Sequence, residues 1–237
     1  MNRMHRTAFA IALGIAPWLL AEPALAQNPQ QNPVRVAAQP PAQEAAKPVA
    51  RGDVNLDKSR VYVRVGKTGF GHDHGVTGKL KQGKIHLADP QAGDSLVFDM
   101  ATFDADSPGA RKYVGLTGTT DEGTRSQVNA NLLGPSVLNA RQFPTATFQV
   151  KSITKLASSN PAEQSYRIDG DFTLHGTTRR ISVQSRAEDS GDWTHLRGSF
   201  AILQSDFGIT PFSKAFGAVG VADRLEIWGD FWVANPR

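Results

Sequence analysis

The sharpest chemical feature of the sequence is a pair of histidines within Gly71-His72-Asp73-His74-Gly75. On an extended strand, side chains two positions apart share one face, so both imidazoles could bind one zinc, copper or nickel ion. Such an ion needs a third and usually a fourth ligand, for which His86, His175, His195 and several aspartates are available. The flanking glycines favour instead a turn or a strand start with hydrogen-bonded or exposed histidines. We expect the turn or strand start, and metal binding is the alternative.

No other group of residues predicts catalysis. Asp206-Phe207-Gly208 matches the metal-binding triplet of protein kinases, but no glycine-rich phosphate loop and no His-Arg-Asp loop accompanies it. Residues 104–109 contain two carboxylates, yet their Ser, Pro and Gly are typical of a turn in which aspartate caps backbone groups. No serine lies in a Gly-x-Ser-x-Gly elbow. We therefore predict a binding protein that is not an enzyme.

The composition is that of an ordinary soluble globular protein, with 40% hydrophobic and 20% charged residues in 237. The absence of cysteine excludes disulfides, thiolate metal sites and cysteine nucleophiles. The net charge of +4, from 26 Lys and Arg against 22 Asp and Glu, is spread along the chain. Because a nucleic-acid site usually shows as a concentrated basic patch, we expect no nucleic-acid partner.

Residues 1–26 are typical of a cleaved signal peptide. Arg3 and Arg6 precede an apolar run over 7–20, and Ala24-Leu25-Ala26 is a cleavage motif. The run is shorter than the roughly 20 residues that span a bilayer. We therefore expect export to the periplasm, or secretion, with no stable membrane insertion after cleavage. Residues 27–52 are rich in Gln, Pro and Ala and predict a flexible linker, so the folded domain is expected over 53–237.

Alternation with period two predicts that this domain is built from β-strands. Leu96, Phe98 and Met100 share one strand face, and residues 166–174 form another strand that ends at a turn at 175–177. Residues 80–85 predict a hairpin with a turn at 82–83. About eight strands with short connections indicate an antiparallel barrel or sandwich. One helical insertion is expected over 119–133, ending at Gly134-Pro135, and a further helical turn over 136–138.

Several large aromatic side chains fall on the apolar faces of these strands, namely Phe98, Phe148, Phe172 and Phe200. For any single residue, packing in an ordinary core is the simpler interpretation. Together they predict an apolar cavity inside an eight-stranded barrel, a size at which one small ligand fits. Burial of each methylene of a hydrocarbon ligand contributes about 0.8 kcal/mol, so a long chain could bind there without specific polar contacts.

Three motifs, taken in order, resemble the YceI-like family of bacterial periplasmic proteins. They are LGPSVLNARQFP at 133–144 leading into ATF at 146–148, IDGDFTLHGTT at 168–178, and QSDFGI at 204–209. The resemblance extends over residues 57–233. It implies an all-β fold, an extended eight-stranded antiparallel lipocalin-like barrel with one short helical insertion. It also implies a long apolar tunnel that holds an isoprenoid or another amphiphile.

The strand faces and the resemblance together predict a tunnel lining that is apolar throughout: Phe98, Met100, Leu132, Leu133, Phe143, Phe148, Phe172, Leu174, Phe200, Phe207 and Ile209. Where many family members have an Arg-Asp pair leading the helix, this chain has EGTRSQ at 122–127. A ligand head group is therefore expected to meet His72, His74 or Arg125.

These observations lead to one main hypothesis and two alternatives. The main hypothesis is a periplasmic lipid-binding protein that sequesters or carries a long-chain isoprenoid or similar amphiphile, with no other cofactor and with homodimerisation left open. The first alternative is a metal-binding protein or metal-dependent enzyme that uses His72 and His74. The second alternative is a structural protein whose tunnel is filled by its own side chains.

Overall fold

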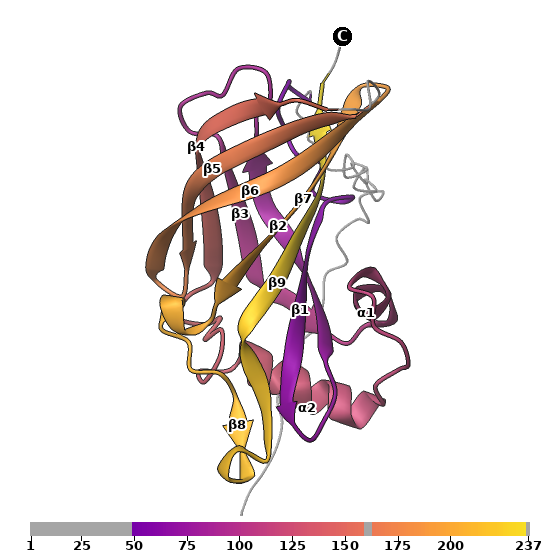
Figure 1. Ribbon diagram of the computed structural model, residues 1–237, viewed down its shortest axis with the longest axis vertical. Helices are drawn as coiled ribbons and strands as arrows, with labels where there is room; N and C mark the ends of the chain where they lie inside the picture. The colour runs from indigo at the N-terminus through magenta and orange to yellow at the C-terminus, as the bar shows by residue number, and fades with distance from the viewer. Residues whose placement is uncertain (1–48, 159–162, 236–237) are drawn as a thin grey trace, which may run out of the picture. The chain divides into compact units, whose positions relative to one another are not determined.

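The computed structural model describes residues 49–158 and 163–235 (Figure 1). The expected signal peptide and residues 27–48 of the expected linker lie outside the described residues, and both stay predictions. Within the described residues, the four short helical segments include none that is long and apolar enough to cross a membrane.

Eight long strands of the described residues form one antiparallel sheet that closes on itself (Figure 1). They are β1 (Arg60–Gly69), β2 (His74–Lys84), β3 (Ser95–Ala105), β4 (Thr145–Leu156), β5 (Gln164–Leu174), β6 (Thr177–Ser190), β7 (Trp193–Leu203) and β9 (Val219–Ala234). Each pairs with its neighbour in this order, and β9 pairs with β1 to close the ring. The two-residue β8 (Ser213–Lys214) adds to the start of β9. The expected eight-stranded antiparallel barrel is confirmed.

The alternation of residue types explains which strand face points inward. Leu96, Phe98 and Met100 of β3 are buried, whereas the residues between them are partly exposed. The same pattern holds along β5, where Ile168 and Phe172 are buried and Arg167 is exposed. Because successive side chains of a strand point to opposite faces, each strand contributes one apolar row to the barrel interior. This arrangement gathers the apolar side chains of distant segments into one core.

The β5–β6 hairpin turns at His175 and Gly176, as expected. Leu174 pairs with Thr177, and the two turn residues have φ values of 50° and 76°. Two left-handed residues form the tight turn that best matches the twist of the flanking strands. Glycine adopts this conformation without the steric cost that a Cβ atom brings.

We expect Gly176→Ala to lower the free energy of unfolding by about 2 kcal/mol, because left-handed backbone costs an alanine about 1–2 kcal/mol. An added Cβ would also lie 2.9 Å from a ring atom of Phe143. Gly191, at the β6–β7 turn with φ 63°, has nothing within 4 Å of such a Cβ. Gly191→Ala is therefore the matched control, with a loss of about 1 kcal/mol in urea unfolding. Equal losses in both variants would show that the Phe143 contact adds nothing.

Along the chain, two α-helices follow β3 and precede β4, and two short 3-10 helices follow β7 and precede β9 (Figure 1). They are α1 (Pro108–Tyr113), α2 (Glu122–Leu133), η1 (Ser205–Phe207) and η2 (Ala215–Gly217). The expected helix over 119–133 exists as α2, which begins later because Asp121 caps it by accepting a hydrogen bond from the Thr124 amide at 2.9 Å. The expected helical turn over 136–138 is a hydrogen-bonded turn instead.

Two expectations about local structure are wrong. The hairpin expected over 80–85 does not form, because β2 continues through Gly83, which pairs with Leu96 of β3. Gly83 serves a close approach rather than a turn, since a Cβ there would lie 2.9 Å from Val54. The turn expected over 104–109 also differs: Asp104 belongs to β3, and Ser107 caps α1 by accepting a hydrogen bond from the Ala110 amide at 3.3 Å.

Candidate functional site

The barrel interior contains a cavity of about 210 Å³. Every long strand contributes to its wall, and α2 contributes Val128, Asn131 and Leu132. Among the described residues that line it, the side chains with polar groups are His74, Asn131, Ser185 and Gln204. The cavity is therefore an almost wholly hydrocarbon surface with a few isolated polar groups, which suits an apolar ligand rather than polar chemistry.

Most of the residues expected to line the tunnel do face this cavity. Those in the wall are Phe98, Met100, Leu132, Phe148, Phe172, Leu174, Phe200 and Ile209. The other three lie outside it. Phe207 is buried with its ring 5.5 Å from that of Phe172, Phe143 packs against the His175 ring, and Leu133 is half-buried at the end of α2. Whether any of them contacts a ligand stays a prediction.

Aromatic rings occupy much of the space inside the barrel. The Phe172 ring packs edge-on against Phe200, with centroids 5.9 Å apart, and the Phe98 ring lies 6.4 Å from that of Phe231. The remaining volume is smaller than the roughly 300–1,000 Å³ of typical sites for drug-sized ligands. A long-chain ligand therefore has to rotate or displace some of these side chains as it enters.

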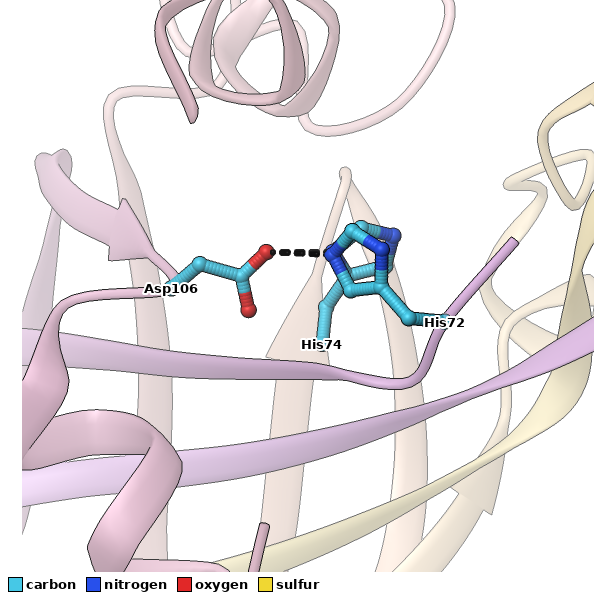
Figure 2. Close-up of side chains that lie close together, drawn as sticks. All are labelled: His72, His74 and Asp106. Carbon is cyan, nitrogen blue, oxygen red and sulfur yellow. Dashed lines mark hydrogen bonds and ion pairs between the residues drawn. The ribbon is translucent and has the colours of Figure 1, made fainter. Parts of the chain in front are cut away.

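A second feature is the meeting of His72, His74 and Asp106 (Figure 2), of which His74 belongs to the cavity wall. His74 is the first residue of β2, Asp106 directly follows β3, and His72 lies in the connection between β1 and β2. The pairing of Val76 with Ala105 brings the start of β2 beside the end of β3. The two histidines therefore lie together because they are close in sequence. Asp106 joins them because of the register between β2 and β3.

One carboxylate oxygen of Asp106 faces both imidazoles. Its Oδ2 lies 2.7 Å from Nδ1 of His74 and 3.2 Å from Nε2 of His72. The Asp106 side chain is fully buried, whereas the side chains of His74 and His72 are 17% and 40% exposed. Thr120 Oγ1 lies 3.3 Å from the same His72 nitrogen. The group thus combines a buried anion with a solvent-accessible histidine.

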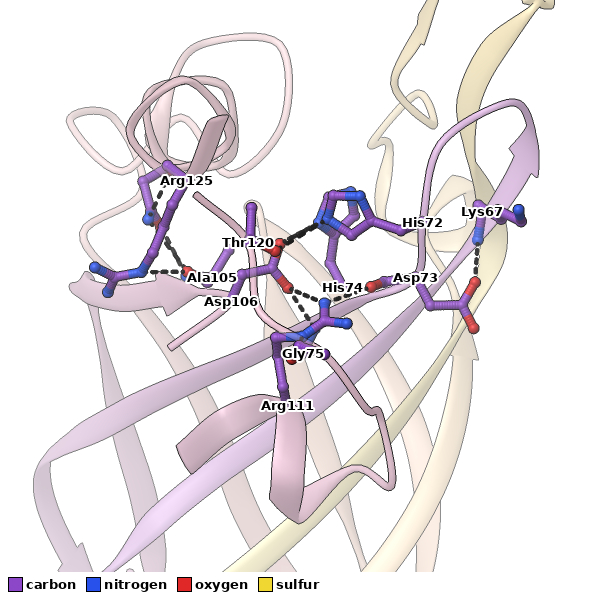
Figure 3. A network of polar contacts seen from close by, with 12 residues as sticks. Lys67, His72, Asp73, His74, Gly75, Ala105, Asp106, Arg111, Thr120 and Arg125 are labelled. Carbon is purple, nitrogen blue, oxygen red and sulfur yellow. Dashed lines mark hydrogen bonds and ion pairs between the residues drawn. The ribbon is translucent and has the colours of Figure 1, made fainter. Parts of the chain in front are cut away.

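The other carboxylate oxygen of Asp106 is held by the protein itself (Figure 3). Its Oδ1 accepts hydrogen bonds from the Gly75 amide at 3.1 Å and from Nη1 of Arg111 at 3.0 Å. The buried Arg111 guanidinium also donates to the carbonyl oxygens of Asp73, Thr117 and Gly118. Asp106 and Arg111 therefore tie the β1–β2 connection, the end of β3 and the chain around α1 together.

These contacts decide the charge state of Asp106. Burial alone would raise the pKa of its carboxyl group, because a buried charge loses its hydration. The hydrogen bond and charge of His74, and then the hydrogen bonds from His72 and the Gly75 amide, outweigh that effect and hold the pKa well below its usual range. Asp106 is therefore an ionised carboxylate at neutral pH.

Arg125, which was expected near a ligand head group, is engaged elsewhere. Its guanidinium forms an ion pair with Asp104. Figure 3 shows its other contact, in which Nε donates a hydrogen bond to the carbonyl oxygen of Ala105 at 3.0 Å. This contact fastens α2 to β3. Of the three residues expected at the head group, His74 lines the cavity, whereas His72 and Arg125 do not belong to the lining.

The other histidines suggested as metal ligands lie apart from the pair. His86 Nδ1 contacts Asp94 at 2.7 Å, His195 Nε2 contacts Asp230 at 2.8 Å, and His175 packs on Phe143. Asp106, which completes the group, was interpreted from the sequence as a turn-capping residue. Nothing in its immediate neighbours indicates the histidines, because the contact depends on a strand pairing between distant segments.

Comparison with known proteins gives a consistent result. A family model described as the YceI-like domain matches residues 53–231. A UPF0312 protein of Yersinia pestis (strain Pestoides F) is 30% identical over 116 residues, 46% of this chain and 57% of that protein. Protein YceI of Salmonella arizonae is 28% identical over the same length, 58% of that protein. The matched region thus spans little more than half the length of these curated relatives.

Among solved structures, BcnA of Burkholderia cenocepacia aligns with a TM-score of 0.51 at 20% identity. The alignment covers 77% of this chain and all of that chain. At this level of identity, the likeness shows that the two chains share a fold.

Proposed function

Because the chain belongs to the YceI-like family, as the match over residues 53–231 shows, we propose that its barrel binds an isoprenoid or a similar long-chain amphiphile. The protein acts as a carrier or a sequestering protein rather than as an enzyme. The single observation that supports this most is the cavity, whose wall is almost wholly hydrocarbon and draws on every long strand. We place this function in the periplasm because residues 1–26 have the pattern of a cleaved signal peptide.

The arrangement of the cavity suits a ligand that is mostly hydrocarbon with one polar end. Transfer of each methylene into the barrel contributes about 0.8 kcal/mol, so a chain of several isoprene units would bind through burial alone. Polar side chains such as His74 and Gln204 are too few to hold a sugar or a nucleotide, but each can accept or donate one hydrogen bond to a head group. Affinity then increases with chain length more than with the chemistry of the head group.

The first test is native mass spectrometry of the full chain purified from its natural host without detergent. We expect an organic adduct that is lost on solvent extraction. The extracted protein should then take up a naphthylamine-type fluorescent probe, and a long-chain isoprenoid alcohol should displace the probe better than its short-chain analogue. A protein that carries no adduct and takes up neither probe nor isoprenoid would contradict the proposal and favour a barrel filled by its own side chains.

A further inference from the structure

We propose that His72, His74 and Asp106 form a binding site for one divalent transition-metal ion. The ligand atoms are Nε2 of His72 and Nδ1 of His74, which lie 3.2 Å and 2.7 Å from the third, Oδ2 of Asp106. Each of the three residues offers a ligand atom within 4.8 Å of the other two. Two imidazoles and one carboxylate are a common ligand set for zinc and for other first-row metals. This proposal is independent of the proposed lipid binding, since it needs no ligand in the cavity.

The two distances from Asp106 Oδ2 to the imidazole nitrogens are near those a metal ion requires. Bonds of about 2.0–2.1 Å in a tetrahedral site place neighbouring ligand atoms roughly 3.3–3.4 Å apart. His72 Nε2 and Asp106 Oδ2 are 3.2 Å apart, so this edge already fits. His74 Nδ1 and Asp106 Oδ2 are 2.7 Å apart and must separate by roughly 0.6 Å to reach the same spacing.

The surroundings of Asp106 resemble the support that protein metal sites give to their ligands. Hydrogen bonds from Gly75 and Arg111 hold Oδ1, so the carboxylate is oriented with Oδ2 toward the two imidazoles (Figures 2 and 3). Such contacts to the atoms behind the ligands fix their orientation and are part of a functional site. The backbone of Asp106 has φ 58°, an uncommon value for a residue other than glycine. Backbone of this kind is concentrated at functional sites.

The position of the site leaves room for a fourth ligand. Thr120 Oγ1 lies 3.3 Å from His72 Nε2, and the His72 side chain is 40% exposed, so the hydroxyl group or a water molecule can complete the coordination. His74 belongs to the cavity wall as well as to the metal site. A bound ion would therefore lie beside the cavity, where an open coordination position could meet an oxygen of a ligand head group.

The competing arrangement is a metal-free ion network. Arg111 already supplies a positive charge to Asp106, and both imidazoles can donate hydrogen bonds to Oδ2. The chain offers matched comparisons for this arrangement, because His86 pairs with Asp94 and His195 with Asp230, and within 49–158 and 163–235 neither pair is part of a group like that of His72, His74 and Asp106. If the His72, His74 and Asp106 group were only a histidine–aspartate ion pair, its histidines would matter no more for metal binding than His86 or His195.

The experiment uses the untagged full chain, stripped with a chelator and titrated with Zn²⁺ by calorimetry and with Co²⁺ by visible absorption. We expect one Zn²⁺ per chain and a Co²⁺ spectrum typical of a four- or five-coordinate site. His72→Ala should weaken Zn²⁺ binding at least tenfold, about 1.4 kcal/mol, because even contacts behind metal ligands are worth about 10–100-fold. His74→Ala should weaken Zn²⁺ binding to a similar extent. His195→Ala is the control and should leave the affinity unchanged.

Two outcomes would overturn the metal site: no Zn²⁺ binding at all, or binding that survives unchanged in the His72→Ala, His74→Ala double variant. His72 carries the test because its side chain is half-exposed and its removal should leave the fold intact, which circular dichroism can check. Uptake of the fluorescent probe by the same variants keeps the two proposals apart. Loss of Zn²⁺ binding with normal probe uptake supports the metal site and leaves the lipid-binding proposal unaffected.

Discussion

Asp106→Asn should lower the free energy of unfolding by about 3 kcal/mol. The Asp106 side chain is fully buried, and that of Arg111, its ion-pair partner at 3.0 Å, is 8% exposed. Removing one partner of a buried ion pair typically costs about 3–5 kcal/mol, because the remaining charge is left without compensation. The lower end applies here, since Arg111 keeps three carbonyl acceptors. Urea unfolding in the presence of a chelator measures the effect without any contribution from a metal ion.

Asp73→Asn is the matched control for this substitution. Asp73 also pairs with an arginine, Arg64 at 2.9 Å, but both side chains are partly exposed. Exposed ion pairs contribute at most about 1 kcal/mol, so the control should lose much less stability than Asp106→Asn. Similar small losses in both variants would contradict the view that Asp106 organises the β1–β2 connection, the end of β3 and α1.

The stability difference between wild type and the Asp106→Asn variant should also depend on pH. The pKa of Asp106 is lower in the folded protein than its ordinary value of 3.8 in the unfolded chain. A group with a lowered folded-state pKa contributes its full stabilisation above the unfolded value and loses it as the pH falls toward the folded value. The stability difference between wild type and Asp106→Asn should therefore shrink as the pH falls below about 4. A difference that does not change with acidification would show that Asp106 is not charged in the folded protein.

Val183→Phe should weaken binding of a long-chain ligand or hydrophobic probe about 50-fold. Val183 of β6 lines the cavity and is only half-buried, so a larger ring at this position extends into free space. The added ring atoms exclude about three methylenes of a ligand, worth about 0.8 kcal/mol each. The sum is roughly 2.4 kcal/mol. Since each 1.4 kcal/mol changes the affinity about tenfold, this sum corresponds to the expected loss of about 50-fold. Displacement titrations of the naphthylamine-type probe measure it.

Gln184→Phe is the control, because Gln184 is the next residue of the same strand and its side chain is exposed. It adds the same ring to the outer face of the barrel and should leave the affinity unchanged. Thermal unfolding should show that both variants remain folded. Unchanged probe binding in Val183→Phe, with the fold intact, would mean that the ligand does not occupy this part of the barrel.

Much of the fold could be predicted because β-strand alternation depends only on neighbouring residues. The apolar rows of β3 and β5 are visible in the sequence, and so is the His175-Gly176 turn between β5 and β6. The number of strands and the shortness of most connections left two architectures open, an antiparallel barrel and a sandwich. The family resemblance, confirmed over residues 53–231, led to the closed barrel.

The errors concern features that depend on contacts between distant residues. Gly83 resembles a turn residue, but it is needed where Val54 packs closely against β2. Pro108 and Gly109 suggest a loop, yet Pro108 at the first position of α1, with the Ser107 cap, begins a helix. The role of Asp106 depends on the register of β2 against β3, which the sequence around either strand does not reveal. The sequence therefore predicted the two histidines of the candidate site but not its aspartate.

The pairing of β9 with β1 has a consequence for the order in which the parts of the barrel can fold. The partners come from the two ends of the domain, as in the pairing of Arg60 with Asp230. Neighbouring hairpins such as β5–β6 can form early, but closure must wait for β9, and contacts between distant segments form slowly. Until then β1 and β7 each present an unpaired edge, to which another chain can add. A chain that stops before Val219 should therefore aggregate, whereas the complete chain loses both free edges once β9 is inserted.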